Sequence, residues 1–215
     1  MIGVIGYGAI SAVGRGADAV RAAADRELTR VARDRELEAA GLRRPFCARA
    51  RVGDETGGDR ATALLSSAIE DCLRSIGPEW QATRIGIAVG TSSGGMRAFT
   101  AKTGTPLDQT YAGPVAASVK RAYAPAAIVL AACASSAIAI GLGRAWLLDD
   151  RCDVVLAGGF DAVSVFVAAG FECLRATCGE RGPRPFRKDR DGLALGEGGA
   201  ILALARDPSR AMAWL

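Results

Sequence analysis

A strand–helix–strand block in the second half of the chain places the strongest constraint on the fold. Residues 126–132 form a continuous apolar run of strand length, which is typical of a strand covered on both faces of a parallel sheet. Residues 137–148 favour a helix, and residues 153–157 form a second apolar strand that a glycine pair closes. This order predicts two parallel strands with a right-handed crossover, and therefore a layered α/β architecture.

The helix expected at residues 137–148 is apolar almost all round, and its one charged residue is Arg144. A helix that covers one face of a sheet keeps a polar stripe toward water, whereas a helix that is apolar all round is buried on both sides. In a lone three-layer domain one side of this helix would face water. The sequence therefore requires another layer, from a second half-domain or from a partner.

The other segments fit the same class. Short strands are expected at the start of the chain and in its last fifth, and a capped helix is expected after Asp59. The expected strands lie at 2–6, 84–90 and 201–204, the helices at 18–42, 59–76 and just before Tyr123, a glycine-rich turn at 6–14 and a loop at 43–58. With no internal repeat or linker, residues 1–215 are expected to form a single unit.

Composition excludes several function classes. The chain has no histidine, and therefore no imidazole for acid–base work near neutral pH. Its net charge is +4, and its arginines alternate with acidic residues, which indicates solvated helix faces rather than a nucleic-acid surface. Its six cysteines are scattered without a CxxC pair, which disfavours a disulfide framework or a metal site and favours the cytoplasm. No apolar run approaches the roughly 18 residues of a membrane span, and the first residues lack a signal-peptide pattern.

Cys133 lies between the strand at 126–132 and the helix at 137–148, with only small neighbours. A strand–turn–helix junction projects a side chain near the amino terminus of the helix, where free N–H groups and the helix dipole favour a thiolate. Cys133 is thus a candidate nucleophile. A buried, inert cysteine is the alternative, because small apolar surroundings suit that as well, and position alone leaves both open.

Three segments together resemble the β-ketoacyl synthase family of the thiolase-like fold. They are Gly6-Tyr7-Gly8-Ala9-Ile10-Ser11, the block from Ala132-Cys133-Ala134-Ser135-Ser136 through residues 154–159, and residues 184–199, whose motif is typical of elongating synthases. The resemblance covers most of the chain and is weakest over residues 20–55 and 96–125. It implies one three-layer α-β-α half of that fold, with a mixed five-stranded sheet.

The resemblance also implies a chemistry. Cys133 would carry the acyl thioester, and its own N–H would supply part of an oxyanion hole. Ser92 and Ser93 would border the acyl pocket, and Ser93 stands where many relatives carry a larger residue. No bound cofactor or metal is implied, because phosphopantetheine arrives on an acyl carrier protein. A homodimer, or a heterodimer with a second synthase subunit or with a carboxy-terminal half, is expected.

Departures from the family pattern leave enzymatic activity open. The family's two catalytic histidines, a lysine and the second oxyanion donor lie in a carboxy-terminal half that these 215 residues do not include. The chain could therefore be a synthase subunit or fragment, a non-catalytic partner like a chain-length factor, or an inactive truncated synthase. Locally, Ala131 replaces the usual threonine, and Arg187 replaces the usual aspartate.

Other motifs are better explained by structure. The segment at residues 6–11 follows a strand like a dinucleotide fingerprint, but its third glycine is absent. The turn at residues 90–95 lacks the Gly-Lys-Ser/Thr ending of a phosphate-binding loop. Cys173 and Cys178 lack the usual metal-ligand spacing. Glu197 is expected to be buried and paired rather than catalytic.

Overall fold

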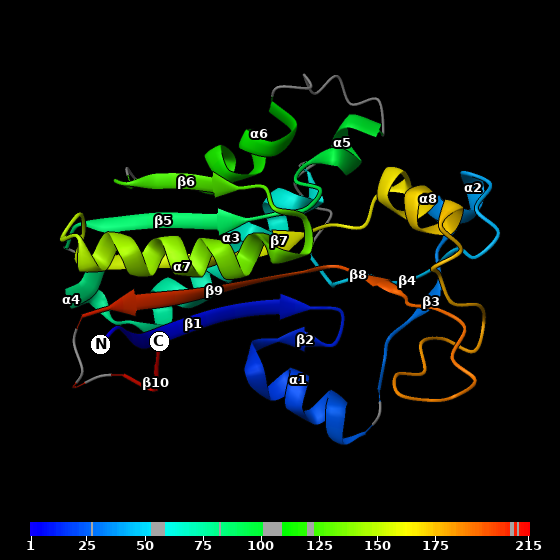
Figure 1. Ribbon diagram of the computed structural model, residues 1–215, viewed down its shortest axis with the longest axis horizontal. Helices are drawn as coiled ribbons and strands as arrows, with labels where there is room; N and C mark the ends of the chain where they lie inside the picture. Colours follow the sequence, from blue (N-terminus) through cyan, green and yellow to red (C-terminus); the bar gives the residue numbers. More distant parts are fainter. Residues whose placement is uncertain are drawn as a thin grey trace.

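The computed structural model describes residues 1–26, 28–52, 59–81, 83–100, 109–119, 123–206, 209 and 211–215. Its main sheet has seven strands in the order β10-β1-β9-β7-β5-β6, and β2 pairs with β1 off this path (Figure 1). These strands are β1 Gly3–Ser11, β2 Gly14–Arg15, β5 Ile85–Gly90, β6 Ala126–Val129, β7 Val154–Asp161, β9 Gly198–Ala205 and β10 Ala213–Trp214. β1, β9 and β7 alternate in direction, whereas β7, β5 and β6 are parallel, so the sheet is mixed as expected.

Five of these strands are the five that the sequence predicted. The other two, β2 and β10, have two residues each, and so short a strand leaves no apolar pattern to detect. The predicted number of five strands in the sheet was therefore wrong, while the predicted α/β class was right. The expected parallel pair is confirmed, since β6 and β7 both run parallel to β5, which lies between them.

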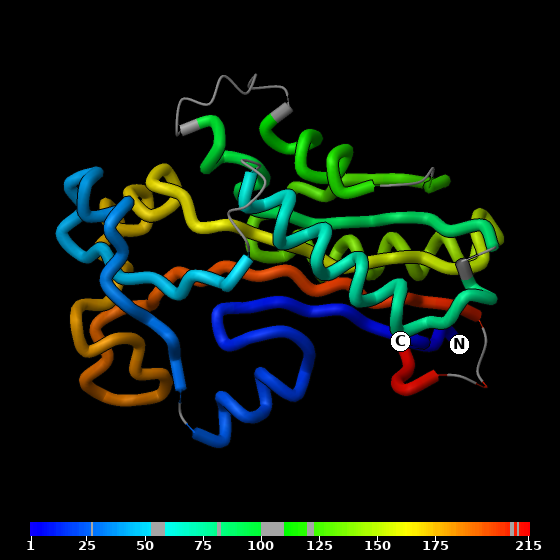
Figure 2. Tube along the Cα trace, turned by 180° about the vertical axis from the view of Figure 1, so that it is seen from behind, coloured from blue at the N-terminus to red at the C-terminus, as the bar shows by residue number. Residues whose placement is uncertain are grey.

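Helices cover both faces of the sheet, which makes three layers (Figures 1 and 2). α3 Arg60–Ser75 and α6 Gln109–Ser118 lie on one face, and α7 Ser135–Leu148 lies on the other. The short helices are α1 Gly16–Asp25, α2 Arg35–Ala39, α4 Pro78–Gln81 and α5 Met96–Thr100. Beyond one end of the main sheet lies a smaller unit with β3 Ala32–Arg33, β4 Phe46–Ala48, β8 Leu195–Gly196 and α8 Val165–Cys173.

Alternation along the strands divides the core into two clusters. Val154 and Leu156 of β7 join the cluster under α3, whereas Val155 and Ala157 join the cluster under α7. Asp59 caps α3 as the sequence predicted, because its carboxylate accepts a hydrogen bond from the Thr62 N–H at 3.2 Å. Six apolar residues of α3 are fully or almost fully buried: Ala61, Leu64, Leu65, Ala68, Ile69 and Cys72.

Two glycine-rich segments that were expected to end strands continue them instead. β1 runs through Gly6 and Gly8, and β7 runs through its glycine pair to Asp161. A Cβ built on Gly8 would lie 2.1 Å from the carbonyl oxygen of Ala68. The glycines therefore let α3 lie directly on β1, and they serve close packing rather than a turn.

Three other expectations also differ from the structure. The charged segment 18–42 is not one helix, because the chain leaves α1 at Asp25 and Asp34 caps the new helix α2. The loop expected at 43–58 contains the short strand β4, and residues 53–58 lie outside the described residues. β6 is an edge strand whose four residues are only partly buried or exposed, since an apolar run cannot distinguish a central strand from an edge strand.

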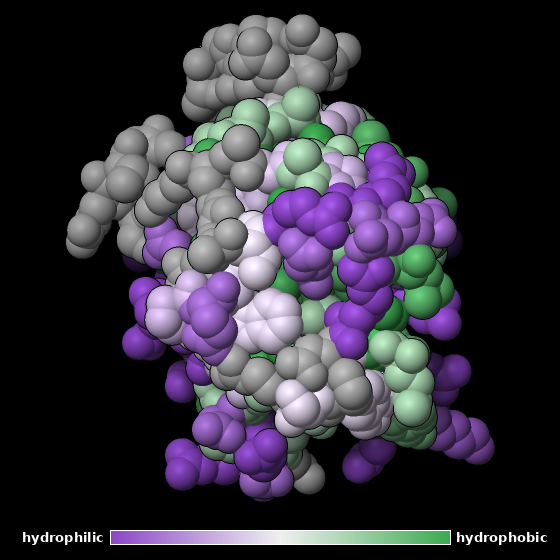
Figure 3. Space-filling view, turned by 90° about the vertical axis from the view of Figure 1, so that its left-hand side faces the viewer, coloured by the Kyte–Doolittle hydropathy of each residue, from purple (hydrophilic) through white to green (hydrophobic). Residues whose placement is uncertain are grey.

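Apart from Arg144, the outward face of α7 is apolar and exposed, as its composition indicated. Trp146 and Leu147 pack onto the sheet, but Ile138 is 49% exposed and Leu148 is 53% exposed. Hydrophobic side chains lie among charged ones on the right-hand side of Figure 3, the side on which α7 lies. Among the described residues no helix is long and apolar enough to cross a membrane. The exposed face of α7 therefore belongs to a helix too short to span a bilayer.

Candidate active site

Three neighbouring strands end at one edge of the sheet, and the candidate residues follow them. Gly90, the last residue of β5, is in register with Val129 of β6 on one side and with Gly159 of β7 on the other. Because parallel strands share the edge at which they end, three segments meet there. They are the turn at residues 91–93 after β5, the turn at residues 131–134 after β6, and the last residues of β7.

Cys133 lies in a short 3₁₀ turn, Ala132–Ala134, that leads directly into α7. Cys133 is exposed. The structure therefore does not support the alternative that it is a buried, inert cysteine. The preceding residue, Ala132, has a φ of +48°, which is uncommon for a residue with a Cβ and costs on the order of 1–3 kcal/mol. The backbone immediately before the candidate nucleophile is therefore held in an unfavourable conformation.

Ser135 and two glycines fix this turn against the sheet. The Ser135 hydroxyl accepts a hydrogen bond from the Ala131 N–H at 2.8 Å and lies 2.7 Å from the carbonyl oxygen of Ala132. A Cβ on Gly90 would lie 2.3 Å from the Ser135 carbonyl carbon, and one on Gly159 would lie 2.0 Å from the Ser136 hydroxyl. Glycine at both strand ends thus lets the start of α7 lie directly on the sheet.

The structure brings Ser92 and Ser93 to the same edge as Cys133. Ser92 is exposed, and its hydroxyl donates to the carbonyl oxygen of Ala132 at 3.3 Å. Ser93 is only 4% exposed, and its hydroxyl donates to Asp161 at 2.8 Å. Ser92 therefore contacts the turn that carries Cys133, whereas the Ser93 side chain is directed to a carboxylate.

Asp161 is a site residue that the sequence analysis missed. It ends β7, and its carboxylate accepts hydrogen bonds from all three residues of the turn at 91–93. The available signal was an acidic residue directly after an apolar strand, at the edge where the neighbouring strands also end. A hollow beside the start of α7 is lined by Asp161 and Ser136, together with residues of α1, β1, β2, β7 and β9.

The other cysteines differ from Cys133 in burial or in position. Burial raises the pKa of Cys47 and of Cys72 to about 12. It also raises the pKa of Cys152 and of Cys178 above the usual value. Cys173 is the other exposed cysteine, but it is the last residue of α8 and does not precede the start of a helix.

We expect Cys133 to be alkylated first of the six cysteines. It is exposed in the short turn that leads into α7, so the reagent can reach its thiol, whereas four of the other cysteines are buried. Mass spectrometry after brief treatment with iodoacetamide measures the order of modification. Cys173→Ala should leave the rate of the first modification unchanged, whereas Cys133→Ala should abolish it. Faster labelling of Cys173 or of a buried cysteine would contradict the assignment.

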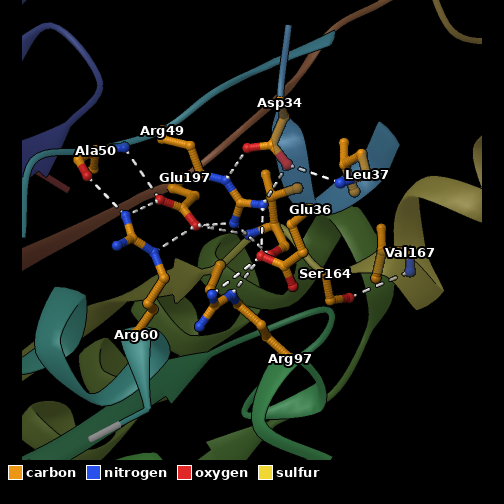
Figure 4. A network of polar contacts seen from close by, with 12 residues as sticks. Asp34, Glu36, Leu37, Arg49, Ala50, Arg60, Arg97, Ser164, Val167 and Glu197 are labelled. Atoms are coloured by element: carbon orange, nitrogen blue, oxygen red, sulfur yellow. Dashed lines mark hydrogen bonds and ion pairs between the residues drawn. The ribbon is translucent and has the colours of Figure 1, made fainter. Parts of the chain in front are cut away.

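A buried ionic network surrounds Glu197, at the start of β9 (Figure 4). The Glu197 side chain is fully buried between Arg49 and Arg60, with its oxygens 2.8 Å and 2.6 Å from their guanidinium nitrogens. Burial opposes the ionisation of Glu197, but the two arginines outweigh it and hold its pKa below the usual value. Glu197 is therefore buried and paired, as the sequence indicated. Among the described residues no cluster of three potential metal ligands occurs.

Comparison with known families identifies the family to which this fold belongs. Residues 54–209 match the family model described as the N-terminal domain of β-ketoacyl synthase. The chain belongs to the β-ketoacyl synthase family. The match includes all three strand ends that form the site, and the resemblance that the sequence motifs suggested is confirmed.

Two curated synthases and one solved synthase illustrate the likeness. The ketoacyl synthase alpha subunit of the tetracenomycin polyketide synthase of Streptomyces glaucescens is 31% identical over 177 residues, which cover 68% of this chain and 41% of that protein. The 3-oxoacyl-[acyl-carrier-protein] synthase 2 of Mycobacterium tuberculosis is 32% identical over 151 residues, or 59% of this chain and 36% of that protein. A β-ketoacyl synthase structure from Burkholderia phymatum superposes with a TM-score of 0.76 at 26% identity, covering 97% of this chain and 59% of the other. The chain thus spans about two fifths of the length of these curated synthases.

The family motif at residues 184–199 departs locally from its usual form. Arg187 is exposed, and its Nε lies 3.9 Å from Asp189. Arg184 forms ion pairs with Asp189 and with Asp191. Arg187 therefore makes an exposed pair within the loop, and such a pair adds little stability.

Proposed function

We propose that this chain is the acyl-accepting part of a β-ketoacyl synthase that acts in fatty-acid or polyketide-type synthesis. Cys133 would attack the carbonyl carbon of an acyl thioester carried by an acyl carrier protein. A new bond would form between Sγ and the acyl carbon, and the phosphopantetheine thiol of the carrier would leave. The observation that carries the proposal is the exposure of Cys133 beside the start of α7, at the edge where β5, β6 and β7 end.

The chain supports one half of the family's reaction. Acyl transfer requires a thiolate and nearby N–H donors, and both requirements fit a cysteine at a helix amino terminus. Decarboxylation of a malonyl group requires donors that stabilise the developing enolate, which the family's histidines supply. The sequence contains no histidine. We therefore propose that condensation depends on residues supplied by a carboxy-terminal half or by a second subunit.

We propose partners from the surfaces that the chain leaves exposed. The exposed apolar face of α7 favours a covering layer from a carboxy-terminal half, and residues 1–215 would then be one half of the complete fold. The half-exposed edge strand β6 favours a homodimer or a heterodimer with a second synthase subunit. The carrier protein would deliver the acyl group, so that no bound cofactor is required. The cytoplasm is the proposed compartment, because a reactive thiol stays reduced there.

We expect the purified chain to accept an acyl group without condensing it. Incubation with an acyl-carrier thioester should add one acyl group, and peptide mapping should locate it on Cys133. With radiolabelled malonyl-carrier protein, release of CO₂ should not exceed that of the Cys133→Ala variant, because no histidine is present to stabilise the enolate.

The two measurements distinguish the alternatives. Acylation that is lost in Cys133→Ala would support a synthase subunit or fragment. No acylation of a folded chain would contradict the proposal and favour a non-catalytic partner or an inactive truncated synthase. Release of CO₂ well above the variant's level would show that the chain needs no further residues for decarboxylation.

A further inference from the structure

The carboxylate of Asp161 is held by an unusual set of partners. Its Oδ1 accepts hydrogen bonds from the Thr91 hydroxyl at 2.9 Å, the Ser93 N–H at 2.8 Å and the Ser93 hydroxyl at 2.8 Å. The Ser92 N–H donates to both carboxylate oxygens, at 3.0 and 3.1 Å. Throughout the described part of the chain no arginine or lysine pairs with Asp161. A carboxylate bonded only by neutral donors of one turn fixes the geometry of that turn.

The turn at residues 91–93 also contacts the backbone beside Cys133. The Ser92 hydroxyl donates to the carbonyl oxygen of Ala132, and the Ser135 hydroxyl lies 3.1 Å from the carbonyl oxygen of Thr91. The Thr91 N–H also donates to the carbonyl oxygen of Val129, at 3.2 Å. Hydrogen bonds thus connect Asp161 to the turn at 91–93, and that turn to Ala132, the residue before Cys133.

Ala132 needs such support because of its backbone conformation. A φ of +48° is unfavourable for alanine, and a residue keeps it only where surrounding contacts fix it. Two hydroxyl groups lie within hydrogen-bond distance of its carbonyl oxygen, those of Ser92 and Ser135. If the turn at 91–93 moved away, one of these contacts would be lost and the conformation could relax.

We propose that Asp161 is a positioning residue that fixes the turn at residues 91–93 and, through Ser92 and Ala132, holds Cys133 beside the amino terminus of α7. The inference rests on the proposed function, because it assumes that Cys133 is the acyl-accepting nucleophile. Asp161, at the end of β7, would act through the turn and would not contact the substrate. Loss of Asp161 should allow the Cys133 thiol to leave its position at the start of α7.

The test is the pH dependence of Cys133 alkylation by iodoacetamide in the 215-residue chain. Asp161→Ala removes both the acceptor and the charge, whereas Asp161→Asn keeps an acceptor oxygen and removes only the charge. For a positioning role, the Ala variant should react about fivefold or more slowly at neutral pH, with its rate midpoint shifted to higher pH. The Asn variant should stay close to the unsubstituted chain.

A direct charge effect would give the opposite sign. Removal of a nearby negative charge favours a thiolate, so both variants would then shift the midpoint to lower pH, and this result would overturn the inference. A folded Asp161→Ala variant with an unchanged rate and midpoint would overturn it as well. If circular dichroism shows that Asp161→Ala does not fold, the same alkylation measurement is made on Ser92→Ala. This variant removes only an exposed hydroxyl. A wild-type rate and midpoint in Ser92→Ala would then overturn the inference.

Failure of the inference and failure of the proposed function give different results. An unsubstituted chain whose Cys133 fails to react would overturn the proposed function, and the inference with it. A reactive Cys133 that does not respond to substitution of Asp161 would overturn the inference alone.

Discussion

Replacement of Glu197 by alanine should lower the free energy of unfolding by about 3–5 kcal/mol, because it removes a fully buried carboxylate that pairs with both Arg49 and Arg60. The Glu197 carboxylate also accepts hydrogen bonds from the N–H groups of Ala50 and Val163, so its loss leaves buried backbone donors unpaired as well. The expected loss is a large part of the 5–15 kcal/mol that stabilises a typical domain. Urea unfolding followed by circular dichroism measures it.

Two matched variants sharpen this prediction. Glu197→Gln keeps the shape and one acceptor oxygen, so it should destabilise the fold less than alanine does. Glu180→Ala removes an exposed carboxylate that lies 3.4 Å from Arg33, and it should change stability little, because solvent screens such a pair. Equal stability of Glu197→Ala and Glu180→Ala would contradict the importance of the buried network.

The same network makes the fold sensitive to acid. Hydrogen bonds from Arg49 and from the Leu37 N–H outweigh the effect of burial and lower the pKa of Asp34 to about 2, and the pKa of Glu197 is lowered as well. A carboxyl whose pKa is lower in the folded chain stabilises the fold above its unfolded pKa. This contribution is lost as pH falls from about 4 toward 2. Glu197→Gln removes one of these carboxyls, so its stability should fall less over this range.

The purified chain should associate through the uncovered face of α7. If an area on the order of 500 Å² of apolar surface stays exposed, burying it is worth up to about 12 kcal/mol at about 25 cal/mol per Å². Light scattering should therefore show oligomers or aggregates, and a dye that binds apolar surface should fluoresce with the chain. A monodisperse monomer that binds no dye would contradict this expectation.

Substitutions on α7 test which face is responsible. A double variant with Ile138→Lys and Leu148→Lys places charges on the exposed face, so it should reduce association and dye binding without loss of stability. Leu147→Lys instead places a charge in the core, since Leu147 is fully buried, and it should unfold the chain. If the double variant associates as strongly as the unsubstituted chain, another surface must be responsible.

The sequence was most informative where one physical requirement determines the residue pattern. The apolar strand–helix–strand block predicted the parallel strands, the uncovered helix and the position of Cys133 between them. The helix-capping role of Asp59 was predicted equally well, because a short acidic side chain before a periodic apolar run has a single common explanation.

Features that depend on contacts between distant segments could not be read from the sequence. Gly8 and Gly158 resemble turn residues until the structure shows the backbone of another element beside each one. The partners of Asp161 lie 68 to 70 residues away in the sequence, so no local pattern pointed to its role. β2 and β10 are short strands that exist only because β1 lies beside them.

The position of β1 has a consequence for how the chain is made. β1 ends at residue 11, yet its longest pairing is with β9, which begins at residue 198, and its other neighbours include β10 near residue 213. At a synthesis rate of about 5–20 residues per second, the first strand leaves the ribosome roughly 10–40 seconds before its main partner exists. During that time α3, which lies directly on Gly8, is available to cover it. The main sheet is complete only after β9 and β10 have been synthesised, and such long-range pairing makes folding slow.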